Sequence, residues 1–216
     1  MCDLILLRHG ETAGQSSVRF YGSTDIGLSE FGQEQMRCAG EALRKMPFKT
    51  VIVSPLRRSR DSADIVLDGL LLPEYVVVDC FREIDFGAWE GLTADEIEKR
   101  DPENFNAWKK YGSLSRFPGG DSRAEFFSRV AETAQDVFSC AEYPVLAVLH
   151  KGVIKGILSA LLGIPIEEIT DRPIELGSIQ RLSKSNDYPL QSCSVGWELV
   201  SMNDTGHLGN YRIDHS

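Results

Sequence analysis

The sequence lacks the long apolar runs of a membrane protein. No apolar stretch in its 216 residues approaches the length of about 20 that a membrane-spanning helix needs. The opening residues Met1–Leu7 are too short for a secretory signal and include the acidic Asp3. We therefore expect a soluble, cytoplasmic protein with no membrane partner, in which Leu4–Leu7 forms the first buried strand.

Cysteines are few and do not form a pattern. Their number is odd, their spacing is wide, and none belongs to a C-x-x-C pair. A disulfide framework or a zinc site would need paired cysteines at shorter spacing. We therefore predict reduced thiols and no structural metal. The cysteines are Cys2, Cys38, Cys80, Cys140 and Cys193.

Positive charge is also scarce. The chain has 23 Lys and Arg against 32 Asp and Glu, a net charge of −9, which argues against nucleic acid as a partner. Residues 1–61 nevertheless carry nine basic side chains against seven acidic ones, whereas the remainder carries 14 against 25. Scattered surface charge is the plain explanation. A locally basic part of an acidic chain also fits a focused anion-binding site.

Repeats, low-complexity tracts and Gly/Ser linkers are missing too, so we predict one domain over residues 1–216. No coiled-coil seam or exposed apolar face indicates an oligomeric state. What the chain does contain is a series of short apolar runs, which are typical of strands covered on both faces. The predicted strands are Leu4–Leu7, Thr50–Val53, Tyr75–Val78, Val145–Leu149, Ser178–Leu182 and Val195–Ser201.

Helix signals lie between these runs. Serine or threonine N-caps, S/T-x-x-E capping boxes and a glycine followed by a proline mark where helices begin and end. The predicted helices run from the cap Ser29 to about Met46, over Arg58–Leu67, after Thr93, after Ser122, and from Gly152 to about Gly163. This alternation predicts an α/β protein with a mostly parallel sheet and helices on both faces.

Basic and imidazole side chains follow three of the predicted strands. Arg8-His9-Gly10-Glu11-Thr12 follows the first strand, Ser54-Pro55-Leu56-Arg57-Arg58 the second, and His150-Lys151-Gly152 the fourth. In open α/β sheets, ligands bind beyond the carboxyl ends of the strands. We therefore expect two histidines and several arginines to meet at one end of one sheet.

These residue types suit the transfer of a phosphoryl group. A neutral imidazole such as that of His9 is a competent nucleophile, and the planar forks of Arg8 and Arg58 match phosphate oxygens. Gly10 has no side chain and is predicted to let a phosphate approach the backbone. The second histidine, His150, would donate to the phosphoryl oxygens.

Each of these residues also has a structural explanation. A single histidine is more often structural than catalytic, and a stretch such as Arg57-Arg58-Ser59-Arg60 is usually a solvated helix start. Two histidines at strand ends are harder to explain in that way. Three cations at a helix N-terminus, where the dipole favours anions, make sense beside a bound anion.

A leaving alkoxide needs a proton, so the site also needs an acid. Glu83 follows the third predicted strand and stands among apolar residues, where it could protonate the leaving group and then accept a proton from water. Asp85 and Glu90 compete for this role.

Taken together, these motifs resemble the signature of the histidine phosphatase (phosphoglycerate mutase-like) superfamily. Arg8-His9-Gly10 alone is a weak signal, but the other family motifs follow in the family's order over essentially the whole chain. They are Ser54-Pro55-Leu56-x-Arg58, Glu83-x-x-Phe86-Gly87-x-Trp89-Glu90-Gly91, Pro118-Gly119-Gly120-Asp121-Ser122, the second histidine His150 and the C-terminal segment Asn203–Leu208.

The resemblance implies a role for each matched residue. His9 would be the phosphorylated nucleophile, Glu83 the proton donor, and Arg8, Arg58 and His150 the phosphate ligands. The family needs no metal and no organic cofactor. Its fold implies a three-layer α/β/α sandwich with one antiparallel strand, and its partner is a small phosphorylated metabolite. The stretch Phe86–Thr93 resembles the phosphatase branch that includes α-ribazole phosphatases and broad-specificity phosphatases.

Two positions depart from the family pattern. Gln15 stands where the family commonly has an asparagine that contacts phosphate, and its side chain is longer by one methylene. The family usually reads H-G after the fourth strand, whereas this chain has Lys151 between His150 and Gly152. Lys151 is either a surface residue or an additional phosphate contact.

Three hypotheses remain open at this point. The first is a phosphatase that hydrolyses a small phosphate monoester through a phosphohistidine. The second is a mutase that returns the phosphoryl group to a bound product. The third is a regulatory module that binds phosphate without turnover, and the intact set of catalytic residues argues against it.

Overall fold

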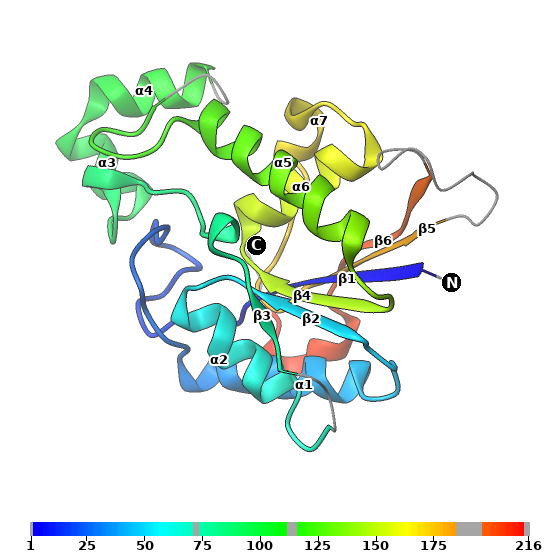
Figure 1. Cartoon of the computed structure of the whole chain (residues 1–216). Coiled ribbons are helices and arrows are strands. Elements are labelled where there is room, and N and C mark those ends of the chain that lie inside the picture. Colours follow the sequence, from blue (N-terminus) through cyan, green and yellow to red (C-terminus); the bar gives the residue numbers. More distant parts are fainter. Residues whose placement is uncertain (1, 71–73, 112–115, 185–195, 214–216) are drawn as a thin grey trace.

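The computed structural model describes residues 2–70, 74–111, 116–184 and 196–213. Its centre is one six-stranded sheet with the order β3-β2-β4-β1-β5-β6 (Figure 1). The strands are β1 (Cys2–Arg8), β2 (Thr50–Val53), β3 (Val76–Val77), β4 (Val145–Leu149), β5 (Ile179–Lys184) and β6 (Trp197–Asp204).

Strand direction follows the prediction. β1 pairs in parallel with β4, β4 with β2, and β2 with β3. β5 runs antiparallel to both of its neighbours, β1 and β6. The predicted mostly parallel sheet with one antiparallel strand is therefore confirmed, and the carboxyl ends of β1, β2 and β4 lie at the same edge.

Helices cover both faces of the sheet, which gives the predicted three-layer sandwich (Figure 1). α1 (Glu30–Leu43) and α2 (Arg57–Val66) pack on one face, against side chains such as Ile5 and Val148. α5 (Arg123–Cys140) and α6 (Lys151–Leu162) pack on the other, against Leu6 and Ala147. Neighbouring residues of one strand therefore belong to opposite cores, as the period of two in a strand requires.

The predicted helix signals act as caps. The Ser29 and Ser122 side chains accept hydrogen bonds from the first turns of α1 and α5. Thr93 and Glu96 form a complete capping box at the start of α3 (Ala94–Arg100). Gly163 ends α6 in the left-handed conformation (φ 66°), which a glycine adopts without strain.

Some elements differ from the prediction. α1 ends at Leu43, three residues before Met46, and β3 is only two residues long. Val195, the predicted start of the last strand, lies outside the described residues, and β6 continues to Asp204. Two short helices, α4 (Pro102–Tyr111) and α7 (Ile166–Thr170), were not predicted.

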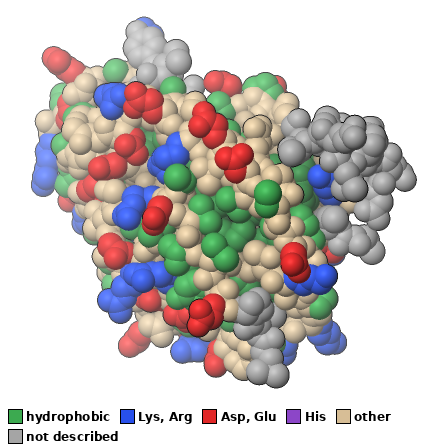
Figure 2. All heavy atoms as spheres, viewed as in Figure 1, with side chains coloured by type: hydrophobic (Ala, Val, Ile, Leu, Met, Phe, Trp, Pro, Cys, Tyr) green, Lys and Arg blue, Asp and Glu red, His purple; other side chains and the backbone are tan. Residues whose placement is uncertain are grey.

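The surface agrees with a mixed-charge protein. Acidic and basic side chains alternate over the face shown in Figure 2, and hydrophobic side chains gather in its middle. In the described part of the chain, no helix is both long and apolar enough to span a bilayer. The cysteines whose side chains are described, Cys38, Cys80 and Cys140, are free thiols.

Candidate active site

The two predicted histidines meet at the carboxyl edge of the sheet. His9 directly follows β1 and His150 directly follows β4, the parallel neighbour of β1. The His9 peptide N–H donates to the carbonyl of Leu149 at 3.0 Å, so the pairing of the strands continues into the site. The two imidazole rings lie 5.1 Å apart, centroid to centroid, at an angle of 61°.

Hydrogen bonding fixes the tautomer of His9. Its Nδ1 lies 2.7 Å from the carbonyl oxygen of Gly10, and because a carbonyl can only accept, Nδ1 carries the proton. Nε2 therefore keeps its lone pair. Burial, together with the charges of Arg58 and Arg8, holds the pKa of His9 well below its ordinary value. His9 is thus a neutral imidazole at neutral pH.

His150 is held by a partner on each nitrogen. The Arg58 Nε–H can only donate, so Nδ1 of His150 accepts it at 3.3 Å. Nε2–H then donates to the Ser54 hydroxyl at 2.6 Å. Burial lowers the pKa of His150 well below its ordinary value, and the nearby charge of Arg58 lowers it further.

Ser54 is the first residue of the motif after β2, and the structure places its hydroxyl at the ring of His150. Its side chain is fully buried, and its peptide N–H donates to the Ser59 hydroxyl at 3.0 Å. The Ser59 hydroxyl in turn donates to the carbonyl of Val148 at 2.6 Å. Ser54 at the end of β2 and Ser59 in the first turn of α2 therefore orient the ring of His150. In the sequence, Ser54 is marked by its place directly after a strand, at the start of the Ser54-Pro55-Leu56-x-Arg58 motif.

Arg58 is a buried cation behind the two histidines. Besides Nε, its guanidinium donates from Nη1 to the carbonyl of Thr24 at 2.8 Å and from Nη2 to the carbonyl of Gly22 at 2.7 Å. These bonds use three of the five N–H groups of an arginine. Burial lowers the pKa of Arg58 to about 10, so the side chain stays charged at neutral pH.

Arg8 is the cation at the floor of the site. Its Nη1 donates to the carbonyl of Ile174 at 2.6 Å, and its Nε is buried with no hydrogen-bond partner among the described residues. Burial lowers its pKa to about 10, and it too remains charged at neutral pH.

Glu83 reaches the same site from the segment after β3. Its carboxylate accepts the peptide N–H of Gly152 at 2.9 Å and that of Ile84 at 3.0 Å. A Cβ atom on residue 152 would lie 2.5 Å from the carboxylate. A side chain at residue 152 would displace the Glu83 carboxylate, so Gly152 leaves room for the carboxylate to receive both peptide N–H groups.

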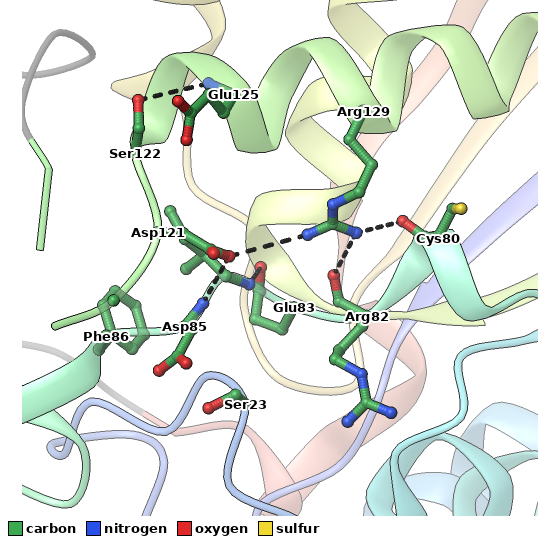
Figure 3. A network of polar contacts seen from close by, with 12 residues as sticks. Ser23, Cys80, Arg82, Glu83, Asp85, Phe86, Asp121, Ser122, Glu125 and Arg129 are labelled. Carbon is green, nitrogen blue, oxygen red and sulfur yellow. Dashed lines mark hydrogen bonds and ion pairs between the residues drawn. The ribbon is translucent and has the colours of Figure 1, made fainter.

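The segment that carries Glu83 is tied to α5 and to the turn before it (Figure 3). The Arg129 guanidinium donates to the carbonyls of Cys80 and Arg82, and it lies 4.0 Å from the carboxylate of Asp121. Asp121 in turn accepts the peptide N–H of Asp85 at 3.0 Å. Both sides of the acid are thus anchored to neighbouring elements.

The two competitors for the role of acid are used elsewhere. Glu90 accepts from the peptide N–H groups of Gly22, Ser23 and Phe86, each at 3.0 Å, and from the loop residue Thr24. The Asp85 carboxylate accepts the N–H of Gly87 at 2.8 Å. Neither carboxylate lines the pocket described below, whereas that of Glu83 does.

A pocket of about 570 Å³ opens beside His9. His9, Arg8 and Glu83 line it, and the aromatic side chains Phe20, Phe86, Trp108 and Phe126 form much of its wall. Phe20 packs edge-on against Phe86 and Trp108, with ring centroids 5.0 and 5.7 Å apart. The unpredicted helix α4 therefore contributes Trp108 to the site. Arg58 and His150 do not line the pocket and lie behind it.

Two predicted phosphate contacts have unexpected surroundings. A Cβ atom on residue 10 would lie 2.3 Å from the carbonyl oxygen of Gly32, so Gly10 is a glycine because the loop packs on α1. The Gln15 side chain is exposed and does not line the pocket, and its backbone is left-handed with φ 62°. An asparagine adopts that conformation more readily than a glutamine. The contacts of both residues with phosphate remain predictions.

Lys151, between His150 and Gly152, lines the pocket, and so do three other cations that sequence reasoning missed. They are Arg19, Arg123 and Lys155. No three His, Cys, Asp or Glu side chains of the described residues are grouped in a way that could hold a metal ion.

A mostly parallel sheet with histidines, arginines and a buried glutamate at its carboxyl edge is an arrangement that comparison with known proteins assigns to a family. The family model of the histidine phosphatase superfamily (branch 1) matches residues 4–204. The chain belongs to this superfamily, and its members are enzymes of the phosphatase or mutase type.

Curated relatives of both types match this chain. A glucosyl-3-phosphoglycerate phosphatase of Mycolicibacterium vanbaalenii is 31% identical over 173 residues, 76% of each chain. A "probable phosphoglycerate mutase" of Yersinia enterocolitica is 31% identical over 223 residues, 99% of this chain and 98% of its own. Three mycobacterial proteins are 38% identical over 161 residues, but the chain spans only 44% of their length.

The solved structures agree on the fold. The α-ribazole phosphatase of Shigella flexneri superposes with a TM-score of 0.82 over 99% of both chains. Its sequence identity is 24%, so this likeness concerns the fold alone.

Proposed function

We propose that this chain is a phosphatase that hydrolyses a small phosphorylated metabolite through a phosphohistidine at His9. One observation carries the proposal: a neutral histidine with a free Nε2 lines a pocket together with a cation, Arg8, and a carboxyl group, Glu83. Phosphoryl transfer needs a nucleophile, positive charge and a proton donor, and these three side chains supply them.

In the first step, Nε2 of His9 attacks phosphorus as the bond from phosphorus to the leaving oxygen breaks. Protonated Glu83 gives its proton to that oxygen, and the product alcohol departs. In the second step, the Glu83 carboxylate takes a proton from water while the water oxygen attacks phosphorus. The nitrogen–phosphorus bond then breaks, which releases inorganic phosphate and restores the lone pair of His9 and the protonated acid.

The cations stabilise the charge on the transferring group. Arg8 contacts its oxygens, and Arg58 adds positive charge from behind the histidines, with two N–H groups that donate to none of the described residues. Both nitrogens of His150 have partners, so its Nε2–H donates to phosphate only when it exchanges the Ser54 hydroxyl for a phosphoryl oxygen.

A covalent adduct on His9 is the direct test. Mixing the protein briefly with a labelled phosphate monoester, quenching it in base and mapping the peptides should locate the label on the peptide that contains His9. His9→Ala should abolish both adduct and turnover. Persistent phosphate release by a folded His9→Ala variant contradicts the mechanism.

The whole-length similarity to a "probable phosphoglycerate mutase" favours a mutase as the second candidate. A mutase would keep water from the phosphohistidine and return the phosphoryl group to the product. Incubation with phosphoglycerate isomers separates the two, because a phosphatase releases phosphate whereas a mutase interconverts the isomers. Binding of substrate without either reaction would indicate a regulatory module.

A further inference from the structure

One wall of the pocket is basic and takes no part in the proposed chemistry. Lys151 and Lys155 are four residues apart on α6, so they lie on the same side of that helix. Arg123 is the first residue of α5, which packs closely on α6 where Val130 faces Gly156. All three side chains line the pocket that contains His9, and we call them the basic wall.

The charges around the pocket are unbalanced. Among the described residues, its charged lining consists of Arg8, Arg19, the basic wall and a single carboxylate, Glu83. Arg19 has its own partner, since it forms an ion pair with Glu96 at 2.9 Å. Within the described ranges of the chain, the basic wall forms no ion pair with a carboxylate. Positive charge therefore exceeds negative charge at this surface.

Two of these cations have weak surroundings in the described part of the chain, since Lys151 is exposed and the Arg123 guanidinium lies over the Phe127 ring, 5.8 Å from its centroid. Lys155 has a structural partner, because its Nζ donates to the carbonyl of Thr170 at the end of α7, where a cation is favourable. Lys151 and Arg123 begin helices, where the dipole disfavours a cation. The Nε of Arg123 is also buried without a hydrogen-bond partner among the described residues.

The three cations are close enough to affect one another. Burial, followed by the charges of Lys151, Arg8 and Arg123, lowers the pKa of Lys155 to about 8, although Asp171 opposes the shift. Such a cluster is unfavourable by itself, and an anion bound among the three would relieve the repulsion.

The pocket also has room for more than a phosphoryl group. A volume of about 570 Å³ falls within the range of roughly 300–1,000 Å³ of sites that enclose a whole small molecule. We propose that the basic wall binds a second anionic group of the substrate, so that the preferred substrates are phosphate monoesters that also carry a carboxylate or a second phosphate. This proposal rests on the proposed phosphatase function.

Matched substrates test it. Phosphoserine and phosphoethanolamine differ only in a carboxylate, and propane-1,3-diyl bisphosphate and propyl phosphate differ only in a second phosphate. In at least one pair, the wild type should hydrolyse the substrate that carries the second anionic group with a kcat/KM about 10–100-fold higher, the size of a charge-assisted contact. The pair that shows the preference identifies the second group as a carboxylate or a phosphate.

Variants locate the preference. The double variant Lys151→Ala/Arg123→Gln should lose at least tenfold more kcat/KM on the substrate with the second anion than on its partner, mainly through KM. Lys45→Ala/Lys49→Ala removes two positive charges from exposed positions between α1 and β2 and is the matched control for net charge. It should not change the ratio within a pair.

Binding to the His9→Ala variant separates this inference from the proposed function, because it needs no turnover. Calorimetry should show tighter binding of phosphoserine or of the bisphosphate than of its partner. Preferential binding without hydrolysis by the wild type would overturn the phosphatase function alone. Equal or undetectable binding within both pairs, or a preference that the double variant keeps, would overturn the second-anion site.

Discussion

Adjacent residues of the same type have very different surroundings in this site. Arg57 has a side chain that is 65% exposed and forms a surface ion pair with Asp61. Arg58, the next residue, is fully buried and donates to His150 and to two carbonyls of the 22–24 loop. Position along one turn of α2 therefore decides which arginine can influence the chemistry.

The two arginines should differ in their effect on turnover. Arg58→Lys keeps the charge but loses the planar fork, and we expect kcat to fall by about 10²-fold, as on loss of one transition-state donor. Arg57→Ala removes only a surface pair and should change kcat less than about twofold. Steady-state kinetics on nitrophenyl phosphate measures both, after circular dichroism shows that each variant is folded. If Arg58→Lys and Arg57→Ala lowered kcat equally, Arg58 would stabilise the fold and not the transition state.

Glu83 should matter most when the leaving group is poor. An alkyl phosphate leaves as a strongly basic alkoxide that needs a proton, whereas nitrophenolate hardly does. Glu83→Gln keeps the shape but cannot donate an acidic proton, so kcat on an alkyl phosphate should fall by about 10²–10⁴-fold. The loss on nitrophenyl phosphate should be much smaller.

Glu90→Gln is the matched control for this comparison. Glu90 holds the 22–24 loop and does not line the pocket, so its loss should lower stability and affect both substrates alike. Equal losses on both substrates for Glu83→Gln would move the role of acid to another group.

The sequence pattern predicted the site residues that follow the ends of strands. His9, His150 and Arg58 follow strand ends, and parallel pairing brings strand ends together. The contact of Gly10 with Gly32 depends on how the loop packs on α1, and no local pattern contains that information.

The segment that carries the acid shows how one element positions another. Between β3 and Glu83 it forms a short 3-10 turn, Asp79–Phe81, and Arg129 of α5 binds the carbonyls on either side of Phe81 (Figure 3). Arg129 does not line the pocket, and we infer that it positions Glu83 through these contacts.

Arg129→Ala should therefore slow alkyl phosphates several-fold more than nitrophenyl phosphate, because a loosely held Glu83 protonates the leaving oxygen less often. Arg129→Lys should restore part of the difference. Arg116→Ala removes an exposed ion pair with Glu125 and is the control for charge and helix stability. The same loss on both substrates for Arg129→Ala, without rescue by lysine, would mean that this arginine only stabilises the fold.

Among the elements, those with strong local signals were predicted and those defined by packing were not. The capped helices and the fully buried strands β1, β2 and β4 have such signals. β3 pairs over only two residues because its side chains, Val76 and Val77, are about half exposed at the sheet edge. α4 packs through Phe105 and Trp108 against Trp89, a tertiary contact that no periodicity announces.

At the scale of the whole molecule, the site is a region of buried positive charge in a chain with a net charge of −9. Four side chains, Arg8, His9, Arg58 and His150, share this region, and burial together with the charges of the two arginines keeps both histidines neutral. The same surroundings lower the pKa of both histidines in the folded state. At mildly acidic pH the unfolded chain therefore binds protons that the folded state does not bind. Function and stability are therefore linked through pH.

The sign of this link can be worked out for His9 and His150. In the unfolded chain each titrates near its ordinary pKa of about 6.5, whereas in the fold both pKa values lie well below it. Between these values the unfolded state binds more protons, so stability is fully present above pH 6.5 and falls as the pH is lowered. Each histidine contributes a slope of about 1.4 kcal/mol per pH unit.

Urea denaturation at pH 7.5, 6.5, 6.0 and 5.5 measures that slope. The wild type should lose free energy of unfolding steeply below pH 6.5, and His9→Asn/His150→Asn should lose about 2–3 kcal/mol less per pH unit, whatever its stability at pH 7.5. His207, whose pKa burial also lowers, is present in both proteins and cancels in the comparison. Since carboxylates titrate mainly below about pH 5, they contribute little to this window. Equal slopes for the two proteins would mean that the histidines are charged in the fold, and the neutral nucleophile of the proposed mechanism would then be wrong.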